Sequence, residues 1–355
     1  MNRREFIASA LAPALAAAPR NPWPFGVNTY CLRFQKWNDR QLFEWCAAQK
    51  LDAIFLQDSL DPGVMDPKHW AEVRAWTREF GLRIETGGGA IFPKTPADVT
   101  PIVAALRKNI QRAAGMGSPI VRALLASDRY AMPEGSMERH IETAVKLLRE
   151  VRTEAMDAGV KIGLENHKEL QAWETRQVIE GAGKEFVGSY LDTGNPVFVM
   201  EDPATTVEEL GPYAVSFHLR DSLVYQTADG IAVQWVPLGE GTVDFKALVA
   251  KARGILPDVH IYCKPITARP PLTLPIYSDV FWNKWFPRAR SKDLSRFMTL
   301  ARRGRPYDKP HVEADVVGGA RERYMDALKV QQMDHMTLSL DYCRKSLDLG
   351  VRWRA

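Results

Sequence analysis

The sequence predicts an α/β fold, a (β/α)8 TIM barrel with a C-terminal helical extension, and three observations support this prediction. Short apolar segments alternate with helical patterns along most of the chain, which is the order of a parallel barrel. Several helical patterns end in glycine just before the next apolar segment, a common helix-stop signal. The alternation also fits a doubly wound sheet, but no GxGxxG phosphate-binding spacing follows the first strand.

Eight segments are expected to be strands, because most are rich in β-branched or aromatic residues and too short for helices. In chain order they are residues 25–31, 52–57, 82–86, 119–125, 160–165, 186–192, 214–220 and 259–264. Helical periodicity is clearest in residues 39–50, 68–81 and 137–159, and Gly81, Gly117 and Gly159 are the predicted helix ends. The segment TGGGAIFP (86–93) lacks phosphate-binding spacing. We therefore interpret it as a loop whose glycines make room for backbone, and not as a phosphate site.

The chain continues well beyond the eighth predicted strand. Residues 271–287 are rich in aromatic residues and proline, and we expect them to fold over one mouth of the barrel as a lid segment. Residues 293–304 and 321–350 have helical patterns. These helices are expected to complete the outer ring, so that 271–355 forms the extension of a single barrel domain, residues 21–355.

Residues 1–20 are predicted to be a twin-arginine-like signal peptide. Arg3 and Arg4 precede an Ala/Leu-rich stretch and then small residues that suit a signal peptidase. The stretch is too short and too rich in alanine for a stable transmembrane helix. The alternative is a flexible basic N-terminus. We therefore expect an exported, periplasmic protein.

The composition excludes several partners. The net charge is +4 over 355 residues, with no dense basic run in the body of the chain, so we expect neither a nucleic-acid nor a membrane partner. The spacing of Cys31, Cys46, Cys263 and Cys343 matches no zinc motif, and we expect free thiols. Homo-oligomer formation stays open.

Polar residues gather at the ends of three consecutive predicted strands. Strand five ends in Glu165-Asn166-His167, strand six leads into Asp192, Thr193 and Asn195, and strand seven ends in His218, Arg220 and Asp221, with Glu240 in the loop that follows. Each group alone fits an ordinary turn, cap or core histidine. Together they predict an active site, because the carboxyl ends of barrel strands meet at one face.

The pieces ENHKE, LDTGN, HLRD and LGEGTVDF occur in an order and spacing that resemble the xylose-isomerase-like barrel family of sugar isomerases and epimerases, which also includes the type IV apurinic endonucleases. The resemblance covers nearly all of residues 21–355. It implies a divalent metal (Mn, Mg, Zn or Co) held by Glu165, Asp192 and His218, and a carbohydrate substrate that reacts through an enediolate. The endonuclease activity is not expected, since seven histidines are too few for its metal cluster.

Two positions depart from the family pattern. Gln57 stands where a second carboxylate is expected in strand two, and an amide cannot transfer a proton near neutral pH. Lys264 stands where the fourth metal-binding Glu is expected, at the end of strand eight. Lys264 can turn to solvent, lose its proton, or replace the metal. We expect it to pair with Glu165 or Asp192 and to weaken or replace metal binding.

The resemblance and these departures together predict a sugar isomerase or epimerase acting on a sugar or keto-sugar derivative. The alternatives are a catalytically degenerate, carbohydrate-binding barrel, or a lyase or decarboxylase acting on a keto-sugar. The predicted catalytic residues are Glu165, His167 and Lys264. The predicted substrate-binding residues are Asn166, Asn195, Arg220, Asp221, Glu240 and Gln57.

Overall fold

The computed structural model describes residues 23–57, 59–313 and 320–355, so the predicted signal peptide lies outside the described residues. Eight parallel strands close into a barrel in the order β1-β10-β7-β6-β5-β4-β3-β2, which confirms the predicted (β/α)8 TIM barrel. The strands are β1 (Phe25–Asn28), β2 (Ala53–Leu56), β3 (Arg83–Thr86), β4 (Ile120–Ala123), β5 (Lys161–Glu165), β6 (Val187–Asp192), β7 (Ala214–Leu219) and β10 (Ile261–Cys263).

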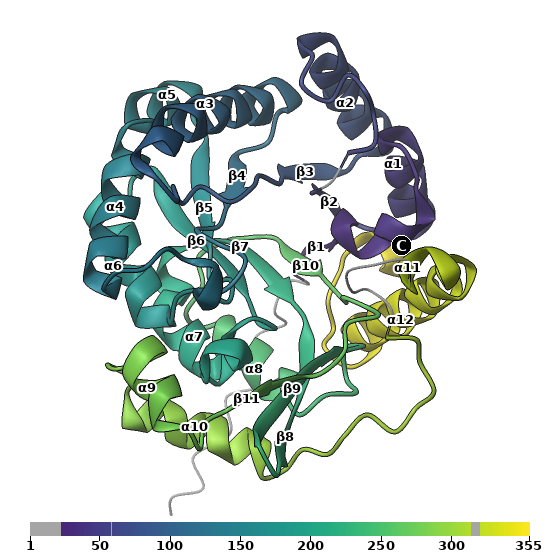
Figure 1. The fold of residues 1–355 in the computed structure, drawn as a ribbon. Helices are drawn as coiled ribbons and strands as arrows, with labels where there is room; N and C mark the ends of the chain where they lie inside the picture. Colours follow the sequence, from purple (N-terminus) through teal and green to yellow (C-terminus); the bar gives the residue numbers. More distant parts are fainter. Residues whose placement is uncertain (1–22, 58, 314–319) are drawn as a thin grey trace, which may run out of the picture.

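Helices surround this barrel, as the view in Figure 1 shows. The α-helices within the barrel portion are α1 (Asp39–Ala48), α2 (Pro67–Phe80), α3 (Val99–Met116), α4 (Met137–Arg149), α5 (Arg152–Ala158), α6 (Ala172–Ala182), α7 (Pro203–Leu210) and α8 (Phe245–Ala252). The C-terminal helices are α9 (Asp279–Trp285), α10 (Ser291–Ala301), α11 (Ala320–Arg323) and α12 (Met325–Lys345). Short 3-10 helices are η1 (Thr29–Gln35), η2 (Pro96–Asp98), η3 (Arg129–Ala131), η4 (Pro196–Val199), η5 (Gly211–Tyr213) and η6 (Arg352–Arg354).

Local sequence signals set the helix ends. Asn38 and Gln41 form a capping box at the start of α1. Gly81, Gly117 and Gly159 end α2, α3 and α5 with φ of 62°, 83° and 63°, a left-handed conformation that glycine adopts at little cost. The predicted glycine stops are therefore confirmed.

Aromatic side chains fill the inside of the barrel. The buried ring of Phe55 packs edge-on against Tyr190, His218 and Tyr262, with ring centroids 5.2, 4.8 and 5.6 Å away. The strands approach closely here, and a Cβ on Gly26 would lie 2.3 Å from the carbonyl oxygen of Ala53. The interior is thus a packed core, and a site can form only at the strand ends.

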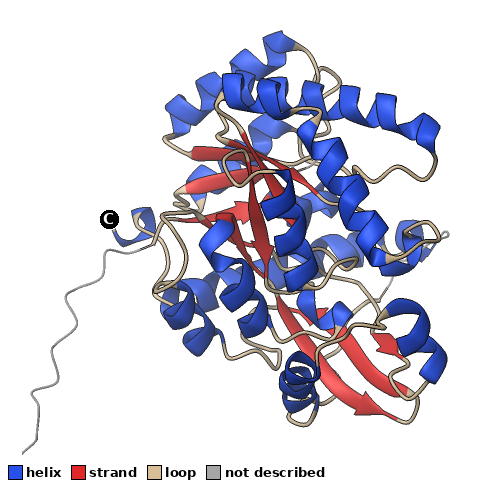
Figure 2. Ribbon diagram, turned by 90° about the vertical axis from the view of Figure 1, so that its left-hand side faces the viewer, coloured by secondary structure: helices blue, strands red, loops and turns tan. Residues whose placement is uncertain are grey.

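The structure adds a second, three-stranded sheet that was not predicted. Strands β8 (Asp221–Thr227) and β9 (Gly230–Val236) form an antiparallel hairpin, and β11 (Leu272–Leu274) pairs with β9. The sheet lies with α9 and α10 beside the barrel (Figures 1 and 2). Buried side chains of β8, β9, β11, α9 and α10 form a separate hydrophobic cluster. The loop expected directly after residue 220 is therefore largely a hairpin.

Two further expectations change in detail. Residues 137–159 form two helices, because the backbone leaves helical geometry at Val151. Of the predicted lid segment, Leu272 lines the cavity at the barrel mouth, whereas Phe281 and Phe286 pack into the second cluster. Across the described ranges, no helix is both long and apolar enough to cross a membrane.

Candidate functional site

The ends of four neighbouring strands position the candidate site. Glu165 is the last residue of β5 and Asp192 the last of β6, while Lys264 directly follows β10. Asp192 pairs in register with His218 of β7, and His218 pairs with Tyr262 of β10. Because the strands are parallel, the side chains at their carboxyl ends share one mouth of the barrel.

Lys264 joins the two carboxylates. Its Nζ lies 3.0 Å from Oε1 of Glu165 and 3.0 Å from Oδ2 of Asp192. Lys264 is 5% exposed, Glu165 2% and Asp192 0%. Charges this deeply buried are stable only when paired, so the ammonium and the two carboxylates form one unit.

Two arginines and an asparagine complete the bonding of these carboxylates. Arg220 donates to Asp192 Oδ2 at 2.7 Å and to Oδ1 at 3.2 Å, and Arg122 pairs with Oε2 of Glu165. Asn195 donates to Glu165 Oε1 at 2.9 Å and accepts from Arg220 at 2.7 Å. Every carboxylate oxygen of Glu165 and Asp192 therefore has a cationic or amide donor.

The cations keep both carboxylates ionised. Burial alone would raise the pKa of Glu165, but Arg122 and Lys264 outweigh burial and hold this pKa well below its usual value. Burial opposes ionisation of Asp192 as well, and Arg220 and Lys264 lower its pKa. Three cations against two carboxylates give this group a net charge of +1.

His218 makes its hydrogen bonds to residues outside this group. Its Nδ1 is 2.9 Å from the hydroxyl of Tyr190, and its Nε2 is 2.7 Å from the hydroxyl of Ser216. The ring is stacked between Tyr190 and Tyr262, with centroids 3.9 and 4.8 Å away. Burial, with Lys264 nearby, lowers the pKa of His218 well below its usual value, so the ring is a neutral part of the barrel core.

These contacts do not fit the divalent metal that the family resemblance implied. The expected ligands Glu165 and Asp192 both bond to Lys264, and both ring nitrogens of His218 have other partners. A divalent ion about 4 Å from a charged lysine would meet a repulsion of about 8 kcal/mol at an effective dielectric constant of about 20. Glu165, Asp192 and His218 are therefore not free to coordinate a divalent ion in this arrangement.

His167 is the imidazole that faces the cavity. It lines the cavity together with Lys264, and burial lowers its pKa to about 3, so the ring is neutral. Its Nδ1 lies 3.8 Å from Oε2 of Glu169. Burial raises the pKa of Glu169 to about 8, so this carboxyl is protonated at neutral pH, while its Oε1 accepts from the amides of Leu125 and Ala126.

Two other predicted substrate-binding residues lie at or just beneath the same mouth. Asn166 exchanges two hydrogen bonds with the backbone of Asp192, at 2.9 and 2.8 Å, and so links β5 to β6. Gln57 lines the cavity, and its Oε1 is buried without a hydrogen-bond partner among the described residues. Asn166 therefore positions the strand ends, and Gln57 can contact a ligand.

Asp221 and Glu240, also predicted to bind substrate, are elsewhere. The carboxylate of Asp221 accepts the amides of Gly239 and Gly241, at 2.9 and 3.0 Å, and so holds the loop after β9. Glu240 pairs with Lys309 beside a different cavity of about 360 Å³. Their positions depend on the hairpin that the sequence analysis did not predict.

The cavity at the barrel mouth has a volume of about 540 Å³, the size of a small-molecule site. Its walls combine cations with aromatic and apolar side chains. The cationic side chains in these walls are Arg122, Lys168, Arg220, Lys264 and Arg269, and the aromatic ones include Phe198 and Trp235.

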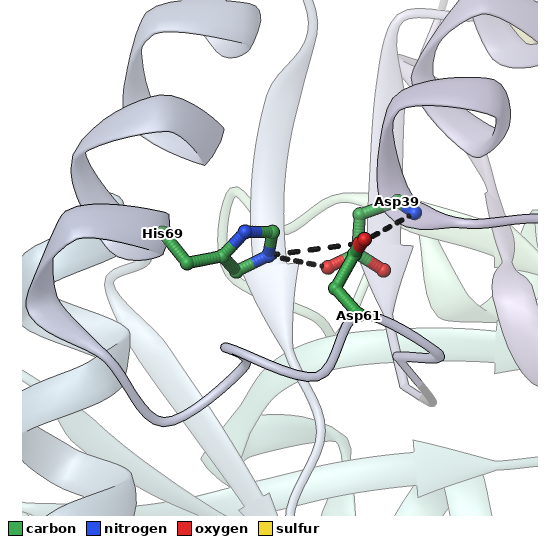
Figure 3. Close-up of side chains that lie close together, drawn as sticks. All are labelled: Asp39, Asp61 and His69. Carbon is green, nitrogen blue, oxygen red and sulfur yellow. Dashed lines mark hydrogen bonds and ion pairs between the residues drawn. The ribbon is translucent and has the colours of Figure 1, made fainter.

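A second group of metal-ligand side chains lies between α1 and α2 (Figure 3). Within the described part of the chain, Asp39, Asp61 and His69 are the one set of three whose ligand atoms all lie within 4.8 Å of one another. His69 Nε2 is 2.8 Å from Asp39 Oδ2, and Asp61 accepts the backbone amide of Asp39 at 2.8 Å. Ser59 also donates to Asp39. These bonds connect the loop after β2 to both helices.

Sequence reasoning missed Arg122 and Lys168. Arg122 is a charged residue inside the otherwise apolar strand β4, and that contrast is a signal that could have found it. Lys168 follows the Glu165-Asn166-His167 run directly. Its place in the cavity wall depends on Phe198 and Trp235, which come from η4 and β9.

Comparison with known proteins agrees with this architecture. A family described as xylose isomerase-like TIM barrel matches residues 43–266, more than half of the chain. The uncharacterized protein YihM of Escherichia coli (strain K12) is 22% identical over 120 residues, 34% of this chain and 37% of YihM. The match thus spans little more than a third of that relative.

Two solved structures are similar in fold. IolI with a bound zinc atom has a TM-score of 0.56 at 14% identity, covering 78% of this chain and 96% of IolI. D-psicose 3-epimerase in the presence of D-fructose has a TM-score of 0.56 at 16% identity, covering 79% of this chain and 99% of that enzyme. At these identities the likeness establishes the fold alone.

Proposed function

Because the chain belongs to the xylose isomerase-like TIM barrel family, we propose that it is a sugar isomerase or epimerase that stabilises an enediolate with Lys264 in place of a divalent metal. One observation supports this above the others: Lys264 Nζ lies 3.0 Å from both Glu165 and Asp192 at the barrel mouth. The family and a fold like that of D-psicose 3-epimerase support a keto- or aldo-sugar substrate.

Removal of a proton next to a sugar carbonyl places negative charge on the carbonyl oxygen. A fixed cation beside that oxygen stabilises the charge, and does so more strongly in a cavity shielded from water. Lys264 lines the cavity and is held in place by two carboxylates. Arg122 and Arg220 line the same cavity and add donors. The role of Glu165 and Asp192 is then to position the lysine.

His167 is the proposed proton acceptor. Its neutral ring lines the cavity, while its Nδ1 is buried beside Glu169. Glu165 is a poorer candidate, because Arg122, Lys264 and Asn195 already donate to its two oxygens. In isomerisation, the ring takes the proton from one carbon and returns it to the neighbouring carbon, while the hydroxyl proton moves between the two oxygens.

Solvent deuterium exchange tests the proposal. The mature protein is incubated in D₂O with a panel of keto- and aldo-sugars, and deuterium incorporation is followed by NMR. We expect Lys264→Met to lower the exchange rate about 100-fold or more, the usual loss when one oxyanion donor is removed. His167→Gln is expected to lower it comparably. Lys184→Met, at an exposed position, is the matched control.

Circular dichroism and thermal unfolding confirm that each variant is folded. Full exchange activity in folded Lys264→Met would exclude the proposed role of this lysine. Sugar binding without exchange in the parent protein would favour a carbohydrate-binding barrel. Bond cleavage without exchange into the recovered sugar would favour a lyase.

A further inference from the structure

The cavity at the barrel mouth has an excess of positive charge. Five cationic side chains line it: Arg122, Lys168, Arg220, Lys264 and Arg269. Asp128 is the one carboxylate in the described cavity wall, and Glu165 and Asp192 lie directly beneath. With His167 neutral and Arg269 left out of the count, the four other cations against three carboxylates give a net charge of +1.

The buried carboxylates do not account for this excess. Glu165 is paired with Arg122 and Lys264, and Asp192 with Arg220 and Lys264. Asp128 accepts from the amide of Ala131 and from the hydroxyl of Ser127. A further cation in such a wall, Lys168, raises the repulsion among like charges, so an anionic group of a ligand would be favourable there.

Lys168 makes no direct ion pair, although the Asp128 carboxylate acts on it at longer range. No carboxylate of the described residues lies within 4.0 Å of its Nζ, although the side chain is half-buried. Its Nζ instead lies 5.4 Å from the ring centroid of Phe198 and 5.7 Å from that of Trp235. Burial lowers the pKa of Lys168, which reflects the cost of holding this ammonium away from water.

Arg220 lies against the same indole. Its Cζ is 4.1 Å from the ring centroid of Trp235, and Trp235 is fixed by a 2.7 Å hydrogen bond to the carbonyl of Gly194. Both cations therefore contact the ring of Trp235, and they lie close enough for Arg220 to help lower the pKa of Lys168. Two cations on a rigid aromatic surface suit an oxyanion, whose oxygens accept from both.

We propose that the substrate carries an oxyanion, a carboxylate or a phosphate, which binds between Lys168 and Arg220 over Trp235. This inference rests on the proposed function for the sugar part of the ligand. The anionic group binds at the aromatic side of the cavity, and the reacting carbonyl then faces Lys264. The substrate class is a sugar acid or a sugar phosphate, and neutral sugars bind weakly.

Direct binding measurements separate the two sources of the oxyanion. Isothermal titration at low ionic strength compares D-galacturonate with D-galactose, D-glucuronate with D-glucose, and D-fructose 6-phosphate with D-fructose. Inorganic phosphate is measured alone. We expect at least one charged sugar to bind 10-fold or more tightly than its neutral partner, and raised salt to reduce that preference. Lys168→Met should reduce it about 10-fold, whereas Lys184→Met should not.

Equal affinity for charged and neutral partners, or an unchanged preference in Lys168→Met, would overturn the inference. So would inorganic phosphate binding as tightly as every charged sugar, because the sugar would then add nothing. Failure of the proposed function looks different: charged sugars bind with the expected preference, but no deuterium is exchanged. Exchange confined to neutral sugars retains the proposed function and removes this inference.

Discussion

Arg129 connects the loop after β4 to helix α6 through an ion pair that is almost fully buried. It donates to Glu174 Oε2 at 2.7 Å and to Oε1 at 2.9 Å, and also to the carbonyls of Glu169 and Trp285. Arg129 is 5% exposed and Glu174 1%. Removing one partner of such a pair leaves a buried charge uncompensated, which is costly.

We therefore expect Glu174→Ala to lower the free energy of unfolding by about 3–5 kcal/mol. Urea denaturation followed by circular dichroism measures the change. Glu142→Ala, at an exposed position without a described ion pair, is the control and should change stability by less than about 0.5 kcal/mol. A loss in Glu174→Ala no larger than in the control would show that the pair contributes little.

The sequence predicted part of the site and missed the rest for identifiable reasons. Glu165, Asp192 and Lys264 could be predicted because each stands at a strand end, and parallel strands bring such residues to one face. The expected pairing of Lys264 is seen with both carboxylates. His218 was grouped with them because it lies on the next strand, but its partners Tyr190 and Ser216 are core residues whose contacts no motif reveals.

Helices α7, α8 and α10 are joined by one carboxylate. Glu208 of α7 accepts from Arg296 of α10 at 2.6 and 3.0 Å, and also pairs with Lys251 of α8. The hydrogen bond from Arg296, assisted by Lys251, lowers the pKa of Glu208 to about 2. The group therefore fastens α10 of the C-terminal extension to the outer ring.

The depressed pKa predicts a pH dependence of stability. Since the folded pKa of Glu208 is about 2 against 4.5 for a free glutamate side chain, its stabilisation is complete above pH 4.5 and is lost as the pH falls through about 2. Glu208→Gln should cost about 1 kcal/mol or less at pH 6, because this side chain is partly exposed to solvent, at 32%. The difference from the parent should shrink toward pH 2 in urea unfolding experiments, and a difference independent of pH would contradict the assignment.

At the level of elements, the barrel strands were predictable and the second sheet was not. Each barrel strand is a short apolar run followed by a helical pattern, which is a local signal. The hairpin had a local signal too, the Asp229-Gly230 pair at the end of its two-residue turn, between alternating segments. The polar strand end before it was, however, interpreted as leading into a loop. Strand β11 pairs with β9 across a long sequence separation, and no local pattern determines that pairing.

The whole molecule combines a family barrel with a three-stranded second sheet that builds one wall of the cavity. Trp235 of β9 and Leu272 of β11 line the cavity together with Lys264. The barrel explains where the proposed catalytic groups lie, and the hairpin supplies the indole that Lys168 and Arg220 contact. Export through the twin-arginine-like segment, residues 1–20, remains a proposal.

The metal content of the purified protein tests whether Lys264 occupies the place of the metal. The mature protein is purified without chelator, dialysed, and analysed for Mn, Zn, Mg and Co, alongside Lys264→Glu and Lys184→Glu. His69→Gln is included because Asp39, Asp61 and His69 form a separate group of ligand side chains. If Lys264 occupies the place of the metal, the parent protein holds far less than one equivalent of metal at the barrel mouth, and Lys264→Glu binds Zn²⁺ more tightly than Lys184→Glu. One equivalent retained by both the parent and His69→Gln, with no gain in Lys264→Glu, would contradict it.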